Sequence, residues 1–196
     1  MSAVRVQIAF FTGRSNPASC ALSPIQTAFL ERLRRPGRQL EPLNFPYRPA
    51  AMPYESVGLI RASINNALDY LGSRRGAFRE RYRPAVEALL SRAPHTVLLM
   101  GSCGLELFVN LALDAHCLER TTVFAFGPVA RSLPPCRCVL VQGRRDWISR
   151  VFVDRADHLI EGHHLDYLLQ EEVLECCESL VDEVVSAERE TARGMP

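Results

Sequence analysis

The sequence predicts an α/β fold, with a mostly parallel six-stranded sheet and helices on both of its faces. Two observations carry this prediction. Short apolar runs alternate along the chain with longer segments of helical apolar spacing, and most of the short runs end at a Gly or Pro. This alternation is typical of parallel sheets, whose functional sites lie at the carboxyl ends of the strands.

The individual elements follow from the same periodicities. Strands are predicted at 4–11, 39–45, 95–100, 121–126, 138–141 and 158–160. Helices are predicted at 23–36, at 56–93 with a break near Gly72 and Gly76, at 105–113 and at 166–190. A chain of 196 residues is the size of one domain, so we expect a single domain over 1–196. Within this domain, we expect the helical segment 46–93 either to pack on the core or to cover the functional site as a lid.

Composition excludes several classes of function. The net charge of +1 favours neither nucleic acid nor an anionic membrane as a partner. No apolar stretch is long enough to span a bilayer, and the first residues do not resemble a secretory signal. Seven cysteines without a regular framework indicate reduced thiols, so we expect a cytoplasmic protein. The oligomeric state does not follow from the sequence.

The most informative segment is 96–105, where an apolar run ends in Gly-Ser-Cys-Gly and helical spacing begins at once. This pattern predicts a strand, a very tight turn and a helix, with a reactive side chain at the apex of the turn. Small residues are needed there because the strand and the helix nearly touch. A helix N-terminus behind the apex favours a thiolate over a thiol.

This turn resembles the nucleophile elbow of α/β-hydrolases, Gly-x-nucleophile-x-Gly. In the favoured register the nucleophile is Cys103, the backbone N–H of Gly104 faces the oxyanion, and Leu105 stands where the family has a very small residue. In the alternative register Ser102 is the nucleophile, and Met100 replaces the first glycine. The resemblance covers the chain from a strand equivalent to the family's third, so the family's first two strands are missing.

The residues that follow strengthen the resemblance, since the family places an acid and then a histidine after the nucleophile. Asp146 follows the fifth predicted strand, and the pair His163-His164 precedes the last helix. The resemblance implies that His164, with His163 as the alternative, is the general base, and that Asp146 orients it. Asp146 is also a candidate helix cap. The second oxyanion donor and substrate contacts are expected in the loop after the first strand, at Gly13, Arg14, Ser15 and Asn16.

The resemblance implies an acyl-transfer enzyme that acts on an ester or thioester through a covalent cysteine acyl-enzyme. A hydrolase, a thioesterase and an acyltransferase all fit, and the acyl group arrives on a small molecule or on a carrier. Arg144-Arg145 would attract a carboxylate or the phosphate of such a carrier. The alternative is a non-catalytic binding or scaffold protein with the same fold.

No cofactor is expected. A flavodoxin-like nucleotide-binding domain also suits the alternation of strands and helices, but no Gly-rich phosphate loop follows the first strand. No metal site is expected either. Cys136 and Cys138 lie on one face of a predicted strand, and no second pair of ligands with zinc-site spacing accompanies them.

Overall fold

A single parallel sheet organises the molecule. The structure is a computed structural model that describes residues 6–48 and 53–194. Its strands, in chain order, are β1 Val6–Phe10, β2 Arg38–Asn44, β3 His95–Gly101, β4 Thr121–Phe126, β5 Arg137–Gly143 and β6 His158–Ile160. They form one six-stranded parallel sheet in the order β2-β1-β3-β4-β5-β6. The predicted fold class is confirmed.

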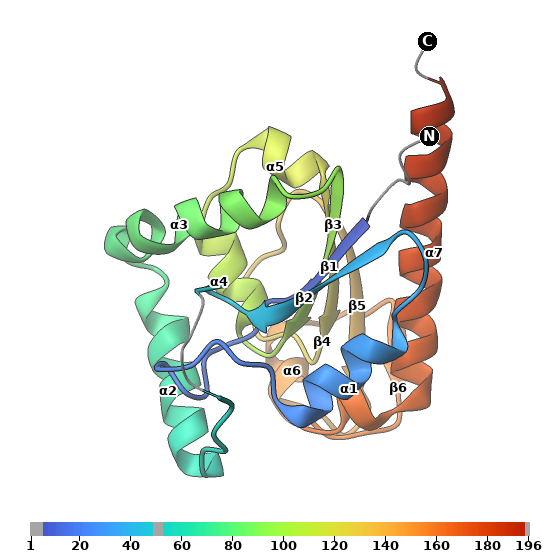
Figure 1. Cartoon of the computed structure of the whole chain (residues 1–196). Helices are drawn as coiled ribbons and strands as arrows, with labels where there is room; N and C mark the ends of the chain where they lie inside the picture. The colour runs from blue at the N-terminus through green and yellow to red at the C-terminus, as the bar shows by residue number, and fades with distance from the viewer. Residues whose placement is uncertain (1–5, 49–52, 195–196) are drawn as a thin grey trace.

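Helices cover both faces of this sheet (Figure 1). They are α1 Pro24–Arg32, α2 Leu59–Gly72, α3 Gly76–Leu90, α4 Gly104–Asn110, α5 Ala115–Glu119, α6 Trp147–Phe152, the short 3-10 helix η1 Tyr167–Leu169, and α7 Glu171–Gly194. The predicted start of α1 is confirmed in detail. Ser23 and Gln26 exchange side-chain to backbone hydrogen bonds in a capping box, and Pro24 occupies the first helical turn.

Successive side chains of the central strands point into two different hydrophobic cores, one on each face of the sheet. In β1, Val6, Ile8 and Phe10 face the core under α1 and α7, whereas Ala9 faces the core under α3, α4 and α5. All of these side chains are fully buried. Successive side chains of a strand point to opposite faces, so a strand that is covered on both sides is apolar throughout. This is why the central strands read as continuous apolar runs in the sequence.

The segment predicted as a possible lid, 46–93, contains two different kinds of helix. α3 buries an apolar face that includes Phe78, Tyr82 and Val86, so it belongs to the core. In α2, only Asp69 is buried. The lid function remains a prediction that concerns α2 and the residues before it, and positions 49–52 lie outside the described residues.

The carboxyl ends of the strands bring distant loops together. The loops that follow β1, β3, β5 and β6 all lie at the same edge of the sheet, because all the strands are parallel. Every residue that the sequence singled out for chemistry lies in one of these loops or at the start of α4. No helix in the described part of the chain is long and apolar enough to cross a membrane.

Candidate active site

The turn between β3 and α4 places Ser102 at its apex. Ser102 has a φ of 51°, a left-handed conformation that a residue with a side chain adopts at a cost, typically at functional sites. The glycines on either side are required by space. A Cβ on Gly101 would lie 2.6 Å from the ring of Phe126, and a Cβ on Gly104 would lie 2.1 Å from the carbonyl oxygen of Phe11. These two glycines therefore let the turn pack closely against the end of β4 and the residue after β1.

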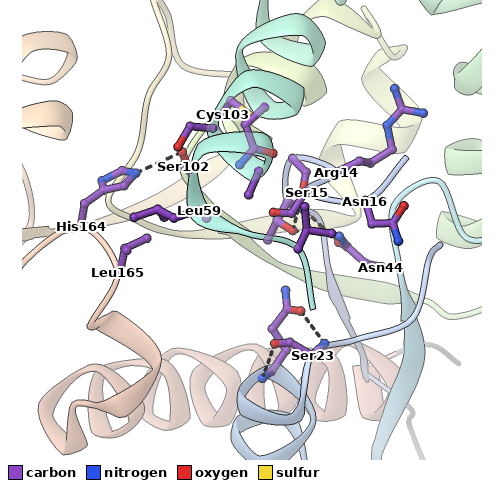
Figure 2. A pocket seen from close by; sticks show the side chains of 18 of the residues that line it. Arg14, Ser15, Asn16, Ser23, Asn44, Leu59, Ser102, Cys103, His164 and Leu165 are labelled. Carbon is purple, nitrogen blue, oxygen red and sulfur yellow. Dashed lines mark hydrogen bonds between the residues drawn. The ribbon is translucent and has the colours of Figure 1, made fainter. Parts of the chain in front are cut away.

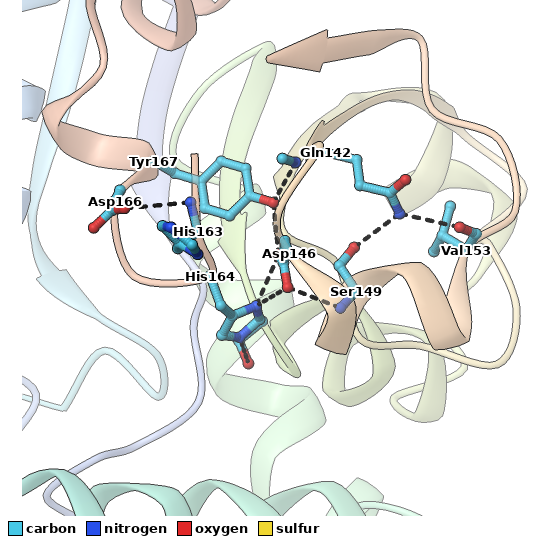
Figure 3. A network of polar contacts seen from close by, with 10 residues as sticks. Gln142, Asp146, Ser149, Val153, His163, His164, Asp166 and Tyr167 are labelled. Carbon is cyan, nitrogen blue, oxygen red and sulfur yellow. Dashed lines mark hydrogen bonds and ion pairs between the residues drawn. The ribbon is translucent and has the colours of Figure 1, made fainter. Parts of the chain in front are cut away.

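Ser102, His164 and Asp146 form a continuous hydrogen-bonded chain (Figures 2 and 3). The Oγ of Ser102 lies 3.1 Å from Nε2 of His164. The other ring nitrogen, Nδ1, lies 2.9 Å from Oδ2 and 3.0 Å from Oδ1 of Asp146. A carboxylate at Nδ1 fixes the tautomer with its proton on Nδ1, which leaves Nε2 free to accept the serine proton.

Asp146 is held by more than the histidine. Its side chain is completely buried. It accepts hydrogen bonds from the phenol of Tyr167 at 2.6 Å and from the backbone N–H of Ser149 at 3.0 Å. Burial alone raises the pKa of Asp146, but the hydrogen bonds from His164, Tyr167 and Ser149 outweigh it and lower the pKa below the ordinary value of an aspartate. The carboxylate stays ionised at neutral pH. Asp146 also caps α6, so the catalytic and the capping interpretations of this residue are compatible.

Tyr167 is a residue that sequence reasoning missed. Its hydroxyl donates to Asp146 and accepts a 2.7 Å hydrogen bond from the backbone N–H of Gly143 at the end of β5. Burial and the neighbouring carboxylate raise the pKa of this phenol, so it remains a donor. A tyrosine three residues after a histidine gives no spacing signal, because the contact depends on how the 161–166 loop folds back onto β5.

Cys103 does not occupy the position that the sequence analysis favoured. Its side chain is 3% exposed and belongs to the core under α3 and α4. Its Sγ lies against Gly13, because a Cβ on Gly13 would come within 2.4 Å of the sulfur. Burial and, second, the charge of Asp69 raise the pKa of the thiol to about 12. The expected lowering by the helix N-terminus is wrong, because desolvation of the thiolate is the larger effect. The residue that contacts His164 is the neighbour, Ser102.

His163, the alternative histidine, is exposed, and its backbone N–H donates to Asp166. Ser102 is hydrogen-bonded to the second histidine of the pair, His164, which is the one that the sequence analysis favoured. Arg144 and Arg145 are also exposed, and both lie near Glu161, with nitrogen–oxygen distances of 3.2 and 3.9 Å. Their attraction for an anion is partly offset by this carboxylate.

Ser102 and His164 open into a pocket of about 650 Å³. The residues expected after the first strand, Gly13, Arg14, Ser15 and Asn16, all line it, together with Cys103. The pocket also takes walls from α1, α2, α6 and the segment 164–168, and apolar side chains dominate these walls. Pockets of this size and character bind small organic molecules.

The loop after β1 is fixed by polar contacts to distant parts of the chain. The Thr12 N–H donates to Asn44 at 3.0 Å, and the Arg14 N–H donates to Asp69 of α2 at 3.0 Å. The guanidinium of Arg14 also donates to Asp69 and to Tyr82. The backbone N–H of Arg14, which was expected among the oxyanion donors, is therefore already engaged.

Asn66 of α2 is the second residue that the sequence analysis missed in this pocket. Its Oδ1 is buried beside Gly13 and has no hydrogen-bond partner among the described residues. A buried amide without a partner is uncommon and marks a place where a ligand group would complete its hydrogen bonding. Nothing in the 56–93 apolar pattern points to this residue, since Asn on a helix usually faces solvent.

Two solved structures share this architecture over nearly their whole length. One is the crystal structure of esterase PE8, which is 14% identical with a TM-score of 0.55, over 92% of this chain and 93% of that chain. The other is TT1662 from Thermus thermophilus, which is 17% identical with a TM-score of 0.52, over 94% and 90%. Along the chain, the turn after β3 comes first, then Asp146 and then His164, which is the order of the corresponding elements in α/β-hydrolases. The chain has the α/β-hydrolase fold.

A further similar structure is alpha/beta hydrolase domain-containing protein 10 from mouse, with 13% identity and a TM-score of 0.48 over 92% of this chain and 90% of that chain. No protein-family model and no curated protein gives a match to the sequence. At these identities, the likeness to solved structures concerns the α/β-hydrolase fold and not the substrate.

In this α/β-hydrolase fold, one cluster of potential metal ligands lies away from the pocket. Glu87, Asp114 and Cys117 have ligand atoms within 4.8 Å of one another, which in the described ranges is the one such group of three. Its charges already have protein partners. Glu87 accepts from Arg83, and Asp114 caps α5 by accepting from the Cys117 N–H. The cluster therefore gives no reason to assign a metal.

Proposed function

We propose that the protein is an ester hydrolase that works through a covalent acyl intermediate on Ser102. The observation that carries this proposal is the hydrogen bond from a strained apex serine to His164, whose other nitrogen is held by a buried aspartate. A serine activated in this way is a nucleophile towards carbonyl carbon. The proposal replaces the cysteine acyl-enzyme favoured by the sequence, because the thiol of Cys103 is buried and protonated.

The reaction has two halves, each with one proton relay. In the first, Oγ of Ser102 attacks the ester carbonyl while Nε2 of His164 takes the hydroxyl proton, and the resulting imidazolium returns that proton to the leaving alcohol. In the second, His164 takes a proton from water, the hydroxide attacks the acyl-serine, and the serine oxygen leaves with the proton. Asp146 stabilises the imidazolium in both halves.

The oxyanion is assigned to backbone donors beside Ser102. With Ser102 as the nucleophile, the N–H that faces the developing charge is that of Cys103, the following residue, rather than that of Gly104. In the loop after β1, the N–H groups of Thr12 and Arg14 are already used, so the second donor is assigned to the N–H of Gly13, which also contacts the thiol of Cys103. Thioesters and acceptors other than water fit the same chemistry, so a carrier-bound acyl group and acyl transfer remain within this proposal.

One observation favours the non-catalytic alternative, which is the engagement of the Arg14 N–H by Asp69. If the oxyanion site were incomplete, the pocket would bind a ligand without turnover. The two functions differ in whether Ser102 reacts.

The test compares wild type with Ser102→Ala and Cys103→Ala on p-nitrophenyl esters of increasing chain length and on a fluorophosphonate probe. We expect Ser102→Ala to lose at least about 10⁴-fold in kcat and all labelling, whereas Cys103→Ala keeps both. Loss of activity and labelling in Cys103→Ala, with retention in Ser102→Ala, would restore the cysteine mechanism. Absence of hydrolysis and labelling in the wild type would favour the binding protein.

A further inference from the structure

The helix α2 turns its polar residues towards the protein and its apolar residues towards solvent, which is the reverse of the usual arrangement. Asn65, Asn66 and Asp69 face the protein, where they contact the loop after β1. Asn65 donates to the carbonyl of Ser15 at 2.8 Å, and Asp69 accepts from Arg14. A helix on a globular protein normally turns its apolar side inward. The inward side of α2 is instead held by hydrogen bonds and one ion pair.

The opposite side of α2 is apolar and exposed. Ile60, Ile64, Leu68 and Leu71 are spaced by four, four and three residues, and they are 79%, 55%, 64% and 58% exposed. At about 100° per residue these four side chains point away from the face that holds Asn65, Asn66 and Asp69. Figure 1 shows α2 standing at one side of the molecule, away from α7.

A second set of exposed apolar side chains lies at the pocket itself. Large apolar side chains that are themselves exposed line the pocket from several segments: Ile25 of α1, Tyr54, Leu59 of α2, Phe152 of α6 and Leu165. α2 and α6 are in contact through two aromatic side chains, because the ring centroids of Tyr70 and Phe152 lie 5.9 Å apart. Beyond this contact, α6 exposes Trp147 and Val151, which are 74% and 73% exposed. Exposed apolar residues scattered singly need no explanation, but a contiguous set around a pocket marks an interaction surface.

The charges on these two helices are of one sign. The exposed charged side chains of α2 and α6 are Arg61 and Arg150, because the single acidic residue of either helix, Asp69, is buried against Arg14. Apolar faces with tryptophan and leucine, flanked by arginine, are typical of helices that lie on anionic lipid surfaces.

We propose that the exposed apolar side of α2 and α6 binds an anionic lipid surface, from which an ester with a large apolar group enters the pocket. The proposal rests on the proposed function for the chemistry of that substrate. A lipid surface fits better than a second copy of the chain. Five of the exposed apolar side chains, those of Ile25, Tyr54, Leu59, Phe152 and Leu165, line the pocket that leads to Ser102. A protein partner on them would block the substrate, whereas a lipid layer would supply it. The net charge led the sequence analysis to expect no membrane partner, and the arrangement of α2 is the reason to propose one.

The experiment separates lipid binding from catalysis. Flotation with vesicles of phosphatidylcholine and phosphatidylglycerol measures binding for the wild type, for the inactive Ser102→Ala protein, for Ile60→Ser/Leu68→Ser, and for Leu133→Ser. Ile60 and Leu68 do not line the pocket, and Leu133 is a matched exposed leucine on the loop after β4. Hydrolysis of water-soluble p-nitrophenyl acetate by the active forms reports the chemistry separately.

We expect Ser102→Ala and Leu133→Ser to float with the vesicles, and Ile60→Ser/Leu68→Ser to lose binding by about tenfold or more. The double variant should keep its rate on p-nitrophenyl acetate but lose rate on a long-chain ester held in the vesicles. No flotation of the wild type would overturn the proposal. So would a dimer in sedimentation that only the double variant dissociates, because the occupant would then be a second copy. Flotation without any ester hydrolysis would instead refute the proposed function.

Discussion

The two sides of the pocket are built on different principles. On the side of β5 and β6, Asp146 and Tyr167 are buried, and each makes several hydrogen bonds that tie His164 to the sheet. On the side of α2, the walls are held by the Arg14–Asp69 pair and by single hydrogen bonds, and most of the helix surface is exposed. The proposed catalytic residues are therefore held by several contacts to the sheet, whereas the wall formed by α2 is attached to the rest of the fold by a few polar contacts.

The largest expected effect is on the sheet side, through Asp146→Asn. The amide cannot favour the same tautomer of His164, so kcat should fall by about 10⁴-fold. KM should change little because Asp146 lies behind His164 and does not line the pocket. Steady-state kinetics on a soluble ester measure both constants. A loss that appeared mainly in KM would mean that this side also forms the substrate wall.

The α2 side is best tested with Asp69→Asn, which leaves the guanidinium of Arg14 without its charged partner. Both side chains are largely buried, at 15% and 8% exposed, so we expect a loss of about 3 kcal/mol in unfolding free energy and a raised KM. Urea denaturation and steady-state kinetics measure these effects.

The matched control for Asp69→Asn is Asn65→Ala, which removes one hydrogen bond from the same helix to the same loop and should cost about 1 kcal/mol. Equal stability of Asp69→Asn and wild type would show that α2 is not anchored by this pair.

A smaller effect is expected from Tyr167→Phe, which removes one of the hydrogen bonds that lower the pKa of Asp146. The stability contributed by this depressed pKa is present above the unfolded value and is lost as pH falls through the folded one. Without the phenol, the folded pKa rises, so acid unfolding should begin at a higher pH. The neutral-pH stability should fall by about 1 kcal/mol. Urea titrations at a series of acidic and neutral pH values measure the pH of acid unfolding and the stability at neutral pH. If Tyr167→Phe unfolded at the same acidic pH as the wild type, the role of Tyr167 would be contradicted.

The smallest effect is expected at the boundary between the two sides, from Cys103→Ala. Its thiol has a pKa of about 12 and lies against Gly13, so the variant should keep kcat within a few-fold. In the folded wild type, iodoacetamide should modify Cys103 more slowly than the half-buried Cys136. Peptide mass mapping after brief alkylation measures this, and rapid modification of Cys103 would contradict its burial.

The fold and most of the site could be predicted from the sequence because they depend on local patterns. Short segments in which apolar residues alternate with others or follow one another without interruption identified the six strands, and Ser23-Pro24 identified the start of α1. The small residues of the turn after β3 and the order of Asp146 and His164 pointed to the loops that the hydrogen-bonded chain of Ser102, His164 and Asp146 joins. In a parallel sheet, loops that follow strands must meet at one edge, so their proximity needed no further information.

The tertiary structure alone decided which neighbour in the Ser102-Cys103 pair faces His164 and which enters the core. Each register leaves one expected small position unfilled, so the local pattern does not choose between them. In the folded chain Ser102 has the left-handed conformation, and Gly104 fits closely against the carbonyl oxygen of Phe11. The same holds for Tyr167, Asn66 and Asp69. Their contacts join segments far apart in the chain, and such contacts depend on packing that no local pattern encodes.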